Sequence, residues 1–377
     1  MTDFDVLIAG AGPAGCATAI SLADFAPKLT TCLLDAGRRD DVRAGESVPP
    51  AIKPLLDHLG LWPAFTADGH APSYRTLSAW GEARLASNEF LFQTQQVGWR
   101  LDRPRFDALM LRSTVARGGA HLCTKVCELE PHDGGWRVRL DDGTALTVRA
   151  VVDATGRSAA LARLRGIRPV RFDRLIGAFM YFDDPTAADR ELIIEAVRDG
   201  WWYTAVLPGG RRVIALMTDA DLARGSVAER DRWLCALSAT EHIAACASRA
   251  RPVGALGLQG AGSQLLSWDG ADTLLSVGDA ASSFDPVSGQ GIVKALRSAI
   301  FASYAMADRL ERGDARGLQR YRAFIAAEFA DYRRTLREYY AAEQRWPDSA
   351  FWQRRHANGA AARYPPAALP VAAMTAL

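Results

Sequence analysis

The sequence contains no apolar run near the roughly 20 residues that a membrane-spanning helix needs. It also shows no basic segment followed by an apolar one near its start, so we expect cytoplasmic residence and no membrane partner. The net charge is only +2, from 45 basic and 43 acidic residues. Such a balance excludes a strong global field that would attract nucleic acid, and we expect no nucleic-acid partner.

Cysteine and histidine are scarce, with six of each, and none of them lies at a spacing typical of zinc sites. We therefore expect no metal, and we interpret Cys123 and Cys127 as reduced packing residues rather than a redox pair. Lysine is rarer still. The chain has four lysines, which are Lys28, Lys53, Lys125 and Lys294.

A glycine-rich turn lies near the start of the chain. An apolar run of strand length at residues 4–9 leads into GAGPAG at residues 10–15, and a helix of small residues follows. In such a unit Gly10 permits the turn, Gly12 lets the backbone approach a pyrophosphate, and Gly15 lets the helix pack closely on the strand. The helix N-terminus then binds the anion.

Asp35 ends the next apolar strand, about 20 residues further on, where a carboxylate accepts a hydrogen bond from a ribose hydroxyl. A carboxylate at this position would repel a 2′-phosphate, so FAD or NAD fits better than NADP. The alternative, a glycine-rich turn without a ligand, does not account for the strand, the helix and Asp35 together.

A second glycine motif lies late in the chain. A buried strand at residues 273–277 ends in Gly278 and Asp279, and the carboxylate there can accept a hydrogen bond from a ribityl hydroxyl, which FAD has and NAD lacks. Residues 284–292 (FDPVSGQGI) form a turn into a helix, whose N–H groups can face the anionic edge of a reduced flavin. Asp279 as a helix N-cap is the alternative.

The remaining pattern predicts the other elements. Asp102 and Pro104 predict the start of a helix, as N-cap and first-turn residue. Residues 125–151 alternate as a β-meander with two glycine turns. We further expect a helix at 51–61, strands over 177–217, helices over 227–246 and a long helical tail over 291–345.

In this order the motifs resemble the FAD-dependent aromatic monooxygenase and flavin-dependent halogenase superfamily, with its glutathione-reductase-type FAD fold. Besides the two glycine motifs, the resemblance rests on residues 45–50 (GESVPP), the helix at Arg103 and residues 153–156 (DATG). It implies an α/β fold with a doubly wound FAD domain, an inserted mixed β-sheet substrate domain and a C-terminal helical tail. The implied boundaries are 1–75, 98–172 and 265–330 for the FAD domain, 76–97 and 173–264 for the substrate domain, and 331–377 for the tail.

The implied cofactor is FAD. Its predicted binding residues are Gly10, Gly12, Pro13, Ala14, Gly15, Asp35, Ala36, Glu46, Ser47, Arg103, Asp153, Gly156, Gly278, Asp279, Pro286, Gly289, Gln290, Gly291 and Ile292. The predicted catalytic residues are Glu46, Trp201, Pro286 and Gly289. Three of these assignments keep an alternative: a solvated position for Arg103, a helix cap for Glu46 and a core position for Trp201.

Residues 200–208 (GWWYTAVLP) are similar to a halogenase motif that separates flavin from substrate. Halogenases of this superfamily also depend on a lysine, but Arg75 lies where the resemblance would place it, and a guanidinium cannot form a haloamine as a tunable ammonium can. Lys53 is the best placed lysine. Residues 45–50, 72–81, 200–208 and 345–348 are similar to flavoprotein maturases that hydroxylate peptidyl tryptophan in tryptophylquinone biogenesis.

The resemblance therefore predicts an FAD-dependent monooxygenase that hydroxylates an electron-rich aromatic ring, indole or tryptophan, free or in a polypeptide, through a flavin C4a-hydroperoxide. Its expected partners are the aromatic substrate, O₂, a flavin reductase or NAD(P)H, and a client protein. Three alternatives stay open: a flavin-dependent halogenase, an FAD-dependent prenyl (ene) reductase, and a maturation partner that acts only with its client. Aromatic and basic residues at 345–355 form either a docking tail or a packed helix end.

Overall fold

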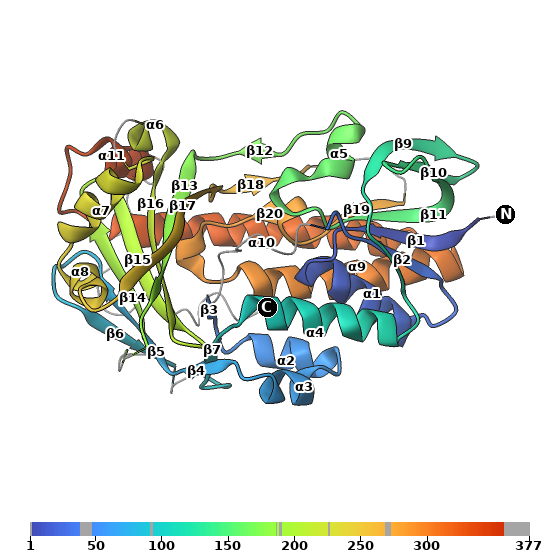
Figure 1. The fold of residues 1–377 in the computed structure, drawn as a ribbon. Helices are drawn as coiled ribbons and strands as arrows, with labels where there is room; N and C mark the ends of the chain where they lie inside the picture. Colours follow the sequence, from blue (N-terminus) through green and yellow to red (C-terminus); the bar gives the residue numbers. More distant parts are fainter. Residues whose placement is uncertain are drawn as a thin grey trace.

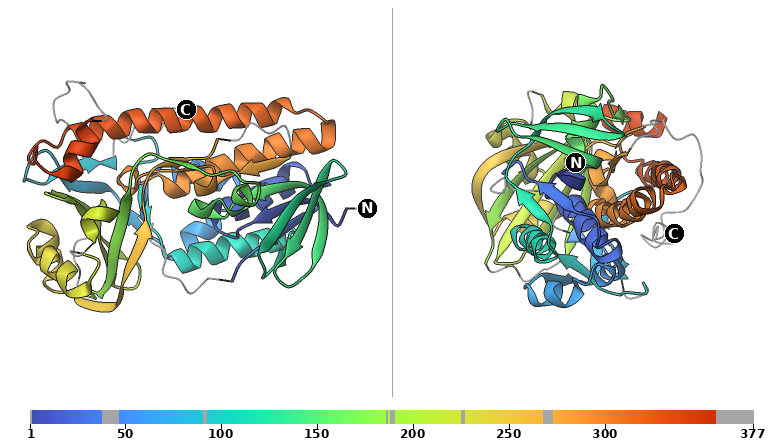
Figure 2. Two further views of the ribbon diagram at one scale, coloured as in Figure 1. Left: turned by 90° about the horizontal axis from the view of Figure 1, so that it is seen from above. Right: turned by 90° about the vertical axis from the view of Figure 1, so that its right-hand side faces the viewer.

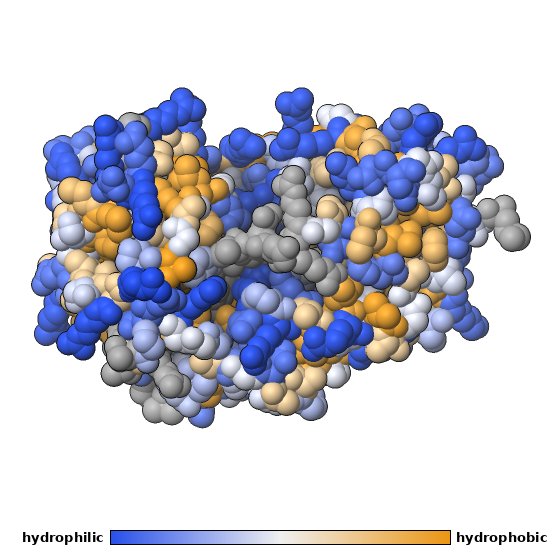
Figure 3. Space-filling view, in the orientation of Figure 1, coloured by the Kyte–Doolittle hydropathy of each residue, from blue (hydrophilic) through white to orange (hydrophobic). Residues whose placement is uncertain are grey.

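The computed structural model describes residues 2–37, 47–90, 93–185, 187, 191–224, 227–267 and 273–357. One sheet with its helices lies at the end of the molecule that carries the N-terminus, and a second sheet lies at the opposite end (Figure 1). The long helix α10 (Arg316–Ala341) extends from one end toward the other (Figure 2). Polar side chains cover much of the face seen in Figure 3, and apolar ones form small groups on it.

The first sheet has a parallel part and an antiparallel part. The parallel strands are β8 (Ala120–Leu122), β2 (Thr31–Leu34), β1 (Phe4–Ala9), β11 (Ala145–Asp153) and β19 (Leu274–Ser276). The antiparallel strands β10 (Gly135–Leu140) and β9 (Val126–His132) continue from β11. Val6, Leu7 and Ile8 of β1 are fully buried, because helices or strands cover both faces of the sheet.

Three helices pack against one face of this sheet: α1 (Pro13–Phe25), α4 (Arg103–Ala116) and α9 (Gly291–Arg312). Small residues in α1 and α9 allow close approach, and the hydroxyls of Ser21 and Ser303 lie 2.6 Å apart across their interface. On the other face, Leu161 of α5 (Ala160–Leu164) packs against the meander. The meander matches the predicted one.

The second sheet contains β17 (Arg251–Gly260), β13 (Leu175–Asp183), β16 (Arg211–Asp219), β15 (Gly200–Leu207), β14 (Leu192–Val197), β5 (Arg75–Ala79) and β6 (Ala86–Glu89), in that order. Its strands come mainly from the segment predicted as the substrate domain. The domain boundaries themselves stay a proposal, and α10 continues without a break through residue 331.

Successive side chains of β15 point to opposite faces of the second sheet, as the strand period requires. Trp201 lies on the face covered by α10 and α11 (Ala350–Ala357), whereas Trp202 packs on Trp233 of α7 (Arg230–Ser238). Helices α6 (Ala220–Ala223) and α8 (His242–Ala247) complete this end of the molecule.

Short elements join the two ends. Strands β3 (Ser47–Val48), β7 (Gly98–Arg100) and β4 (Ala71–Ser73) form one small sheet, and β12 (Val170–Arg171), β18 (Gln264–Leu265) and β20 (Ser282–Ser283) form another. The 3₁₀ turns are η2 (Gly156–Ser158), η3 (Gly278–Ala280) and η4 (Pro286–Ser288). Among the described residues, no helix combines the length and apolarity that crossing a membrane would require.

Two predicted helices are interrupted. The one expected over 51–61 is α2 (Ile52–His58), followed by α3 (Trp62–Ala67), because Gly60 adopts a left-handed conformation (φ 65°) that ends the first helix. The helical tail divides into α9 and α10 because Gly313 (φ 72°) caps α9. The predicted start of α4 is confirmed: the Asp102 side chain accepts a hydrogen bond from the Arg105 N–H at 3.1 Å.

Candidate FAD site

The predicted nucleotide motifs meet at one edge of the first sheet. Ala9 at the end of β1 pairs with Leu34 on one side and with Asp153 on the other, and Asp153 pairs with Ser276 of β19. Because these strands are parallel, the segments after them emerge side by side. This edge, at the carboxyl ends of the strands, is where doubly wound sheets bind their ligands.

The glycines of the first turn differ in what surrounds them. A Cβ atom added to Gly10 would lie 2.3 Å from the Ala154 carbonyl oxygen, and Gly10 has φ 111°. One added to Gly15 would lie 1.8 Å from the Gly10 carbonyl oxygen. At Gly12 it would meet no atom within 4 Å. Gly10 and Gly15 therefore serve close packing, while Gly12 leaves open space before the N-terminus of α1.

The early and late glycine motifs are in contact. A Cβ atom on Gly278 would lie 2.8 Å from that of Ala14, and the Gly278 N–H donates a 2.9 Å hydrogen bond to the Ser298 hydroxyl of α9. Pro13, the first residue of α1, precedes Ala14 in the same turn. The two motifs thus lie side by side, which is the arrangement that a shared nucleotide site would require.

Asp279 lies between two cations that sequence analysis does not assign to the site. Its Oδ1 accepts a hydrogen bond from Nζ of Lys294 at 2.8 Å, and its Oδ2 lies 3.6 Å from Nε of Arg157. Burial alone would raise the pKa of Asp279, but the charges of Lys294, Arg157 and Arg103 outweigh it and hold the pKa below its usual value. The carboxylate is therefore ionised, and its side chain is 35% exposed.

Lys294 is completely buried on α9. Besides Asp279 it contacts the Ser282 carbonyl oxygen, and its ammonium lies 4.9 Å from the ring centre of Phe284. Arg157 donates to the carbonyl oxygens of Gly262 (2.5 Å) and Phe284 (3.0 Å). Two signals in the sequence were available: Lys294 is one of four lysines and directly follows the glycine turn, and Arg157 directly follows Gly156.

The loop predicted to lie beside the flavin ring exposes Pro286, Gly289 and Gly291, and buries Gln290 and Ile292. Added Cβ atoms on Gly289 and Gly291 would meet no atom within 4 Å. The N-terminus of α9 that follows has no side-chain cap. Its N–H groups therefore remain available to an anionic edge of a ligand.

A hydrogen-bond chain links this loop to the second sheet. The Trp201 indole N–H donates to the Tyr340 hydroxyl at 3.0 Å, and that hydroxyl donates to Oδ2 of Asp285 at 2.7 Å. Oδ1 of Asp285 accepts from the Val287 N–H at 3.0 Å, which caps η4. Trp201 is only 1% exposed, so the structure places it behind Tyr340 in the core and joins it to Pro286 through this chain.

Burial raises the pKa of Asp285 to about 6, and the nearby charge of Asp173 adds to this effect. The hydrogen bonds from Val287 and Tyr340 oppose the shift without cancelling it. The pKa of the Tyr340 hydroxyl is raised well above its usual value, first by burial and then by Asp285. Tyr340 is therefore a neutral hydrogen-bond donor to this carboxylate.

The other predicted residues occupy different settings. Asp35 follows β2 at the edge of the sheet, and its Oδ1 accepts from the Gly37 N–H at 3.2 Å, next to exposed Ala36. Arg103 begins α4 and pairs with Asp107 at 3.3 Å. Ser47 pairs in register with Arg100. Glu46, predicted both to bind FAD and to act in catalysis, lies outside the described residues.

Asp153 is fully buried, and its carboxylate is engaged by its own chain segment. Oδ1 accepts from Thr155, and Oδ2 accepts from the N–H groups of Leu161 and Ala162, both at 3.0 Å. Burial raises its pKa. The side chain thus fixes the turn at Gly156 and the start of α5, and it reaches the cofactor site through these elements.

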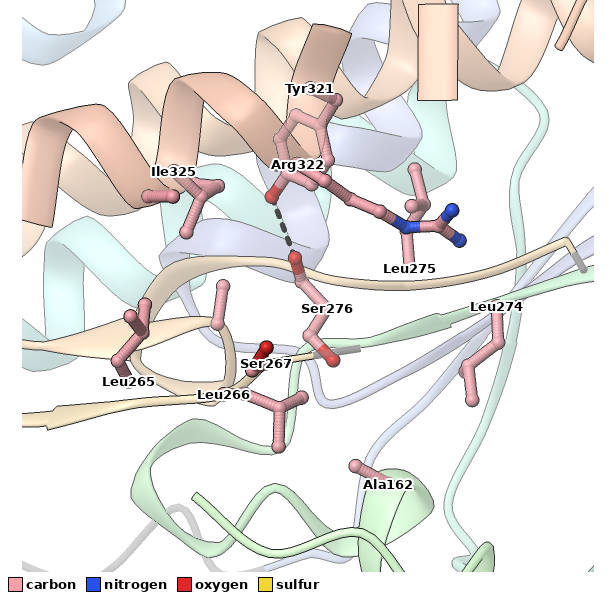
Figure 4. Close-up of a pocket in the computed structure, with 12 residues that line it drawn as sticks. Ala162, Leu265, Leu266, Ser267, Leu274, Leu275, Ser276, Tyr321, Arg322 and Ile325 are labelled. Atoms are coloured by element: carbon pink, nitrogen blue, oxygen red, sulfur yellow. Dashed lines mark hydrogen bonds between the residues drawn. The ribbon is translucent and has the colours of Figure 1, made fainter. Parts of the chain in front are cut away.

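A separate cavity of about 170 Å³ lies between β19, β18 and α10. Leucine side chains dominate its wall, and the Tyr321 hydroxyl points across it to the Ser276 carbonyl oxygen, 2.6 Å away (Figure 4). None of its lining residues belongs to the predicted cofactor set. The glycine edge, and not this cavity, is therefore where the predicted cofactor residues gather.

These observations fit FAD: two helix N-termini without side-chain caps, open space over Gly12, Gly289 and Gly291, and an ionised carboxylate at Asp279. The fold and the site define a flavoprotein with the glutathione-reductase-type arrangement.

A family model described as lycopene cyclase protein matches residues 5–186. LodB of Marinomonas mediterranea, described as an FAD-dependent oxidoreductase, is 33% identical over 370 residues, which cover 96% of this chain and 99% of LodB. The chain belongs to this family of FAD-dependent oxidoreductases, and its cofactor is FAD.

Solved structures agree with this assignment. The myxobacterial chondrochloren halogenase CndH has a TM-score of 0.84 at 21% identity, covering 93% of this chain and 85% of CndH, which shows the fold. The peptidyl tryptophan dihydroxylase QhpG, essential for tryptophylquinone cofactor biogenesis, has a TM-score of 0.76 at 26% identity. That match covers 93% of this chain and 78% of QhpG. The predicted superfamily is confirmed.

Proposed function

We propose that this protein is an FAD-dependent monooxygenase that hydroxylates an electron-rich aromatic ring, an indole or the side chain of a tryptophan in a polypeptide. The overall change inserts one oxygen atom of O₂ into an aromatic C–H bond and reduces the other to water, with two electrons and two protons from a reductant. FAD, when bound, supplies the oxygen-activating chemistry. A reduced nicotinamide, used directly or through a separate flavin reductase, is the proposed electron source.

The observation that carries this proposal is the similarity to QhpG, at 26% identity over 93% of the chain. QhpG is a peptidyl tryptophan dihydroxylase by its own description. Because that match covers 93% of this chain, it extends well beyond the FAD-binding end, and the second sheet is where we expect an aromatic substrate to be held against the flavin loop.

The positions and partners of the four lysines argue against the halogenase alternative. Lys28, Lys53 and Lys125 lie at the surface, and Lys53 pairs with Asp57 at 2.5 Å. The fourth, Lys294, forms a buried ion pair with Asp279. Arg75, at the position where the resemblance expects a lysine, pairs with Glu191 at 2.9 Å. Formation of a haloamine requires an ammonium that can lose its proton, whereas a guanidinium stays protonated.

The chain's own residues would act by positioning and by excluding water. Exposed Pro286 and Gly289 provide a surface for the flavin ring, and the Tyr340–Asp285 bond holds that loop from behind. Trp201 supports Tyr340 from the second sheet. Tyr340 and Trp201 are buried, and a support that excludes water from behind the flavin loop favours oxygen transfer over release of hydrogen peroxide.

The test uses the FAD-loaded protein, reduced anaerobically and then mixed with ¹⁸O₂ and a tryptophan-containing peptide. We expect a product heavier by one atom of ¹⁸O on the indole ring, located by tandem mass spectrometry, because each reduced flavin supplies the two electrons for one insertion. A matched peptide with leucine in place of tryptophan is the control. Hydrogen peroxide in the same amount as the flavin, with every indole and phenol unchanged, would contradict the proposal.

The same assay separates the alternatives. A halogenase would give a product that contains bromine when bromide is added. An ene-reductase would turn over a polyprenyl substrate without O₂. A maturation partner that acts only with its client would hydroxylate the client protein and no isolated peptide.

A further inference from the structure

A cavity of about 460 Å³ lies on the far side of the flavin loop, between α10, α11 and the end of the second sheet. We call it the arginine pocket. Its wall includes Phe172, Arg174, Asp285, Arg333, Arg337 and Tyr340. Asp285 and Tyr340 are the residues whose hydrogen bond supports Pro286, so the pocket borders the back of the proposed active site.

The pocket carries more positive than negative charge, since five arginines and three aspartates line it. Its three aspartates are already engaged: Asp219 by Arg354 and Arg355, Asp173 by backbone N–H groups, and Asp285 by Tyr340. Within the part of the chain that the structure describes, the guanidinium groups of Arg333 and Arg337 form neither a hydrogen bond nor an ion pair. Buried Nε of Arg333 is one of the donors left without an acceptor there.

Arg333 and Arg337 also repel each other. They are four residues apart on α10 and line the same cavity, an arrangement that destabilises a helix when both charges have one sign. Burial lowers the pKa of Arg333, and the charge of Arg337 adds to this effect, while Tyr332 and Asp173 oppose it. The Arg333 guanidinium lies 4.7 Å from the ring centre of Phe172, which fixes its orientation while leaving its N–H edge open. An anion between the two arginines would relieve the repulsion and satisfy the donors.

We propose that the arginine pocket is a carboxylate-binding subsite that orients the ligand beside the flavin loop. Its ligand is a carboxylate attached to an aromatic group, either the free acid of a small indole or an aspartate or glutamate flanking tryptophan in a polypeptide. Arginine suits a carboxylate because its planar N–H edge donates two parallel hydrogen bonds. The assignment of this carboxylate to the substrate rests on the proposed function.

The test measures binding, not turnover, by calorimetry on the oxidised FAD-loaded protein. Two probe pairs distinguish the sources: indole-3-propionate against indole-3-propionamide, and a capped peptide with aspartate on both sides of tryptophan against the same peptide with asparagine. We expect the wild type to bind the acid of at least one pair about tenfold more tightly than its neutral partner, and less so at high salt.

In the double variant Arg333→Met/Arg337→Met this preference should fall to within about twofold. Arg334→Met is the matched control, because Arg334 is the next residue on α10, is 68% exposed and pairs with Asp331 outside the pocket. It should keep the full preference. If the double variant folds poorly, Arg337→Glu replaces it, since Arg337 is exposed and a reversed charge should abolish the preference.

Equal binding of acid and neutral probes by the wild type in both pairs would overturn the subsite, and so would a preference that survives the double variant. The outcome is separate from that of the proposed function. A carboxylate preference without oxygen transfer keeps the subsite and removes the monooxygenase proposal, and oxygen transfer without the preference does the reverse.

Discussion

Gly12 and Gly15 are three residues apart, yet a methyl group would meet different surroundings at each. At Gly15 it would overlap the Gly10 carbonyl oxygen, so we expect Gly15→Ala to lower the free energy of unfolding by about 3 kcal/mol. At Gly12 it would point into open space, so Gly12→Ala should cost no more than about 1 kcal/mol without FAD and should act mainly by weakening FAD binding. Urea unfolding of the FAD-free protein and titration with FAD separate the two effects. Equal destabilisation by both substitutions would show that Gly12 also serves packing.

The buried charge of Lys294 should contribute both to the free energy of unfolding and to FAD binding. Lys294→Met would leave Asp279 with Arg157, 3.6 Å away, as its nearest cation, and we expect a loss of about 3 kcal/mol in the free energy of unfolding together with weaker FAD binding. Lys53→Met is the control, because Lys53 is a partly exposed lysine paired with Asp57, and its loss should cost less than about 1 kcal/mol. Both are measured by urea unfolding and FAD fluorescence. Restored stability in Lys294→Met/Asp279→Asn would show that the unpaired carboxylate is the cause.

At the scale of elements, helix α4, whose first residue is Arg103, begins with a side-chain cap from Asp102. Asp102→Ala would remove the acceptor for the Arg105 N–H, and we expect the free energy of unfolding to fall by about 1 kcal/mol. Asp102→Asn should retain most of that energy, since asparagine caps helices as well as aspartate does. Thermal unfolding of the three proteins gives the comparison. An asparagine variant as unstable as the alanine variant would mean that the charge, and not the cap, stabilises this helix.

The elements that the sequence predicts well are those specified locally. The strand before Gly10, the cap at Asp102 and the meander of β9 to β11 each depend on residues within one segment, and all are found. The break between α2 and α3 differs from the single predicted helix because it depends on the left-handed conformation of Gly60. Trp201 and Tyr340 are 139 residues apart, and no local pattern relates them. The same holds for Arg157, Asp279 and Lys294, whose proximity results from the packing of α9 on the parallel sheet.

On the scale of the whole molecule, α10 and α11 hold the second sheet against the FAD-binding end. Phe351 and Trp352 of α11 are completely buried, and the Trp352 indole N–H donates to the Val197 carbonyl oxygen at 3.0 Å. This confirms the packed-helix interpretation for these two aromatic residues. Arg355 continues the contact by pairing with Asp219 at 2.9 Å. Tyr340 lies where sheet, helix and flavin loop meet, so the protonation state of its partner Asp285 affects all three.

The titration of Asp285 should therefore contribute to the pH dependence of the free energy of unfolding. Its pKa is about 6 in the folded protein and 3.8 as the ordinary value, so between these values the folded state binds more protons than the unfolded state. Stability contributed by this group is then lost as pH rises from about 4 to about 6, by roughly 3 kcal/mol in total, and stays constant above that range. Asp285→Asn cannot titrate, so relative to the wild type its free energy of unfolding should gain this amount between pH 4 and pH 7.

Urea unfolding at a series of pH values measures the difference. Asp314→Asn is the control, since the pKa of Asp314 is lowered to about 2 by Arg316 and its titration falls below this range. A wild type and an Asp285→Asn variant whose stabilities run parallel from pH 4 to pH 7 would show that Asp285 is ionised throughout, and that Tyr340 donates to a permanent charge.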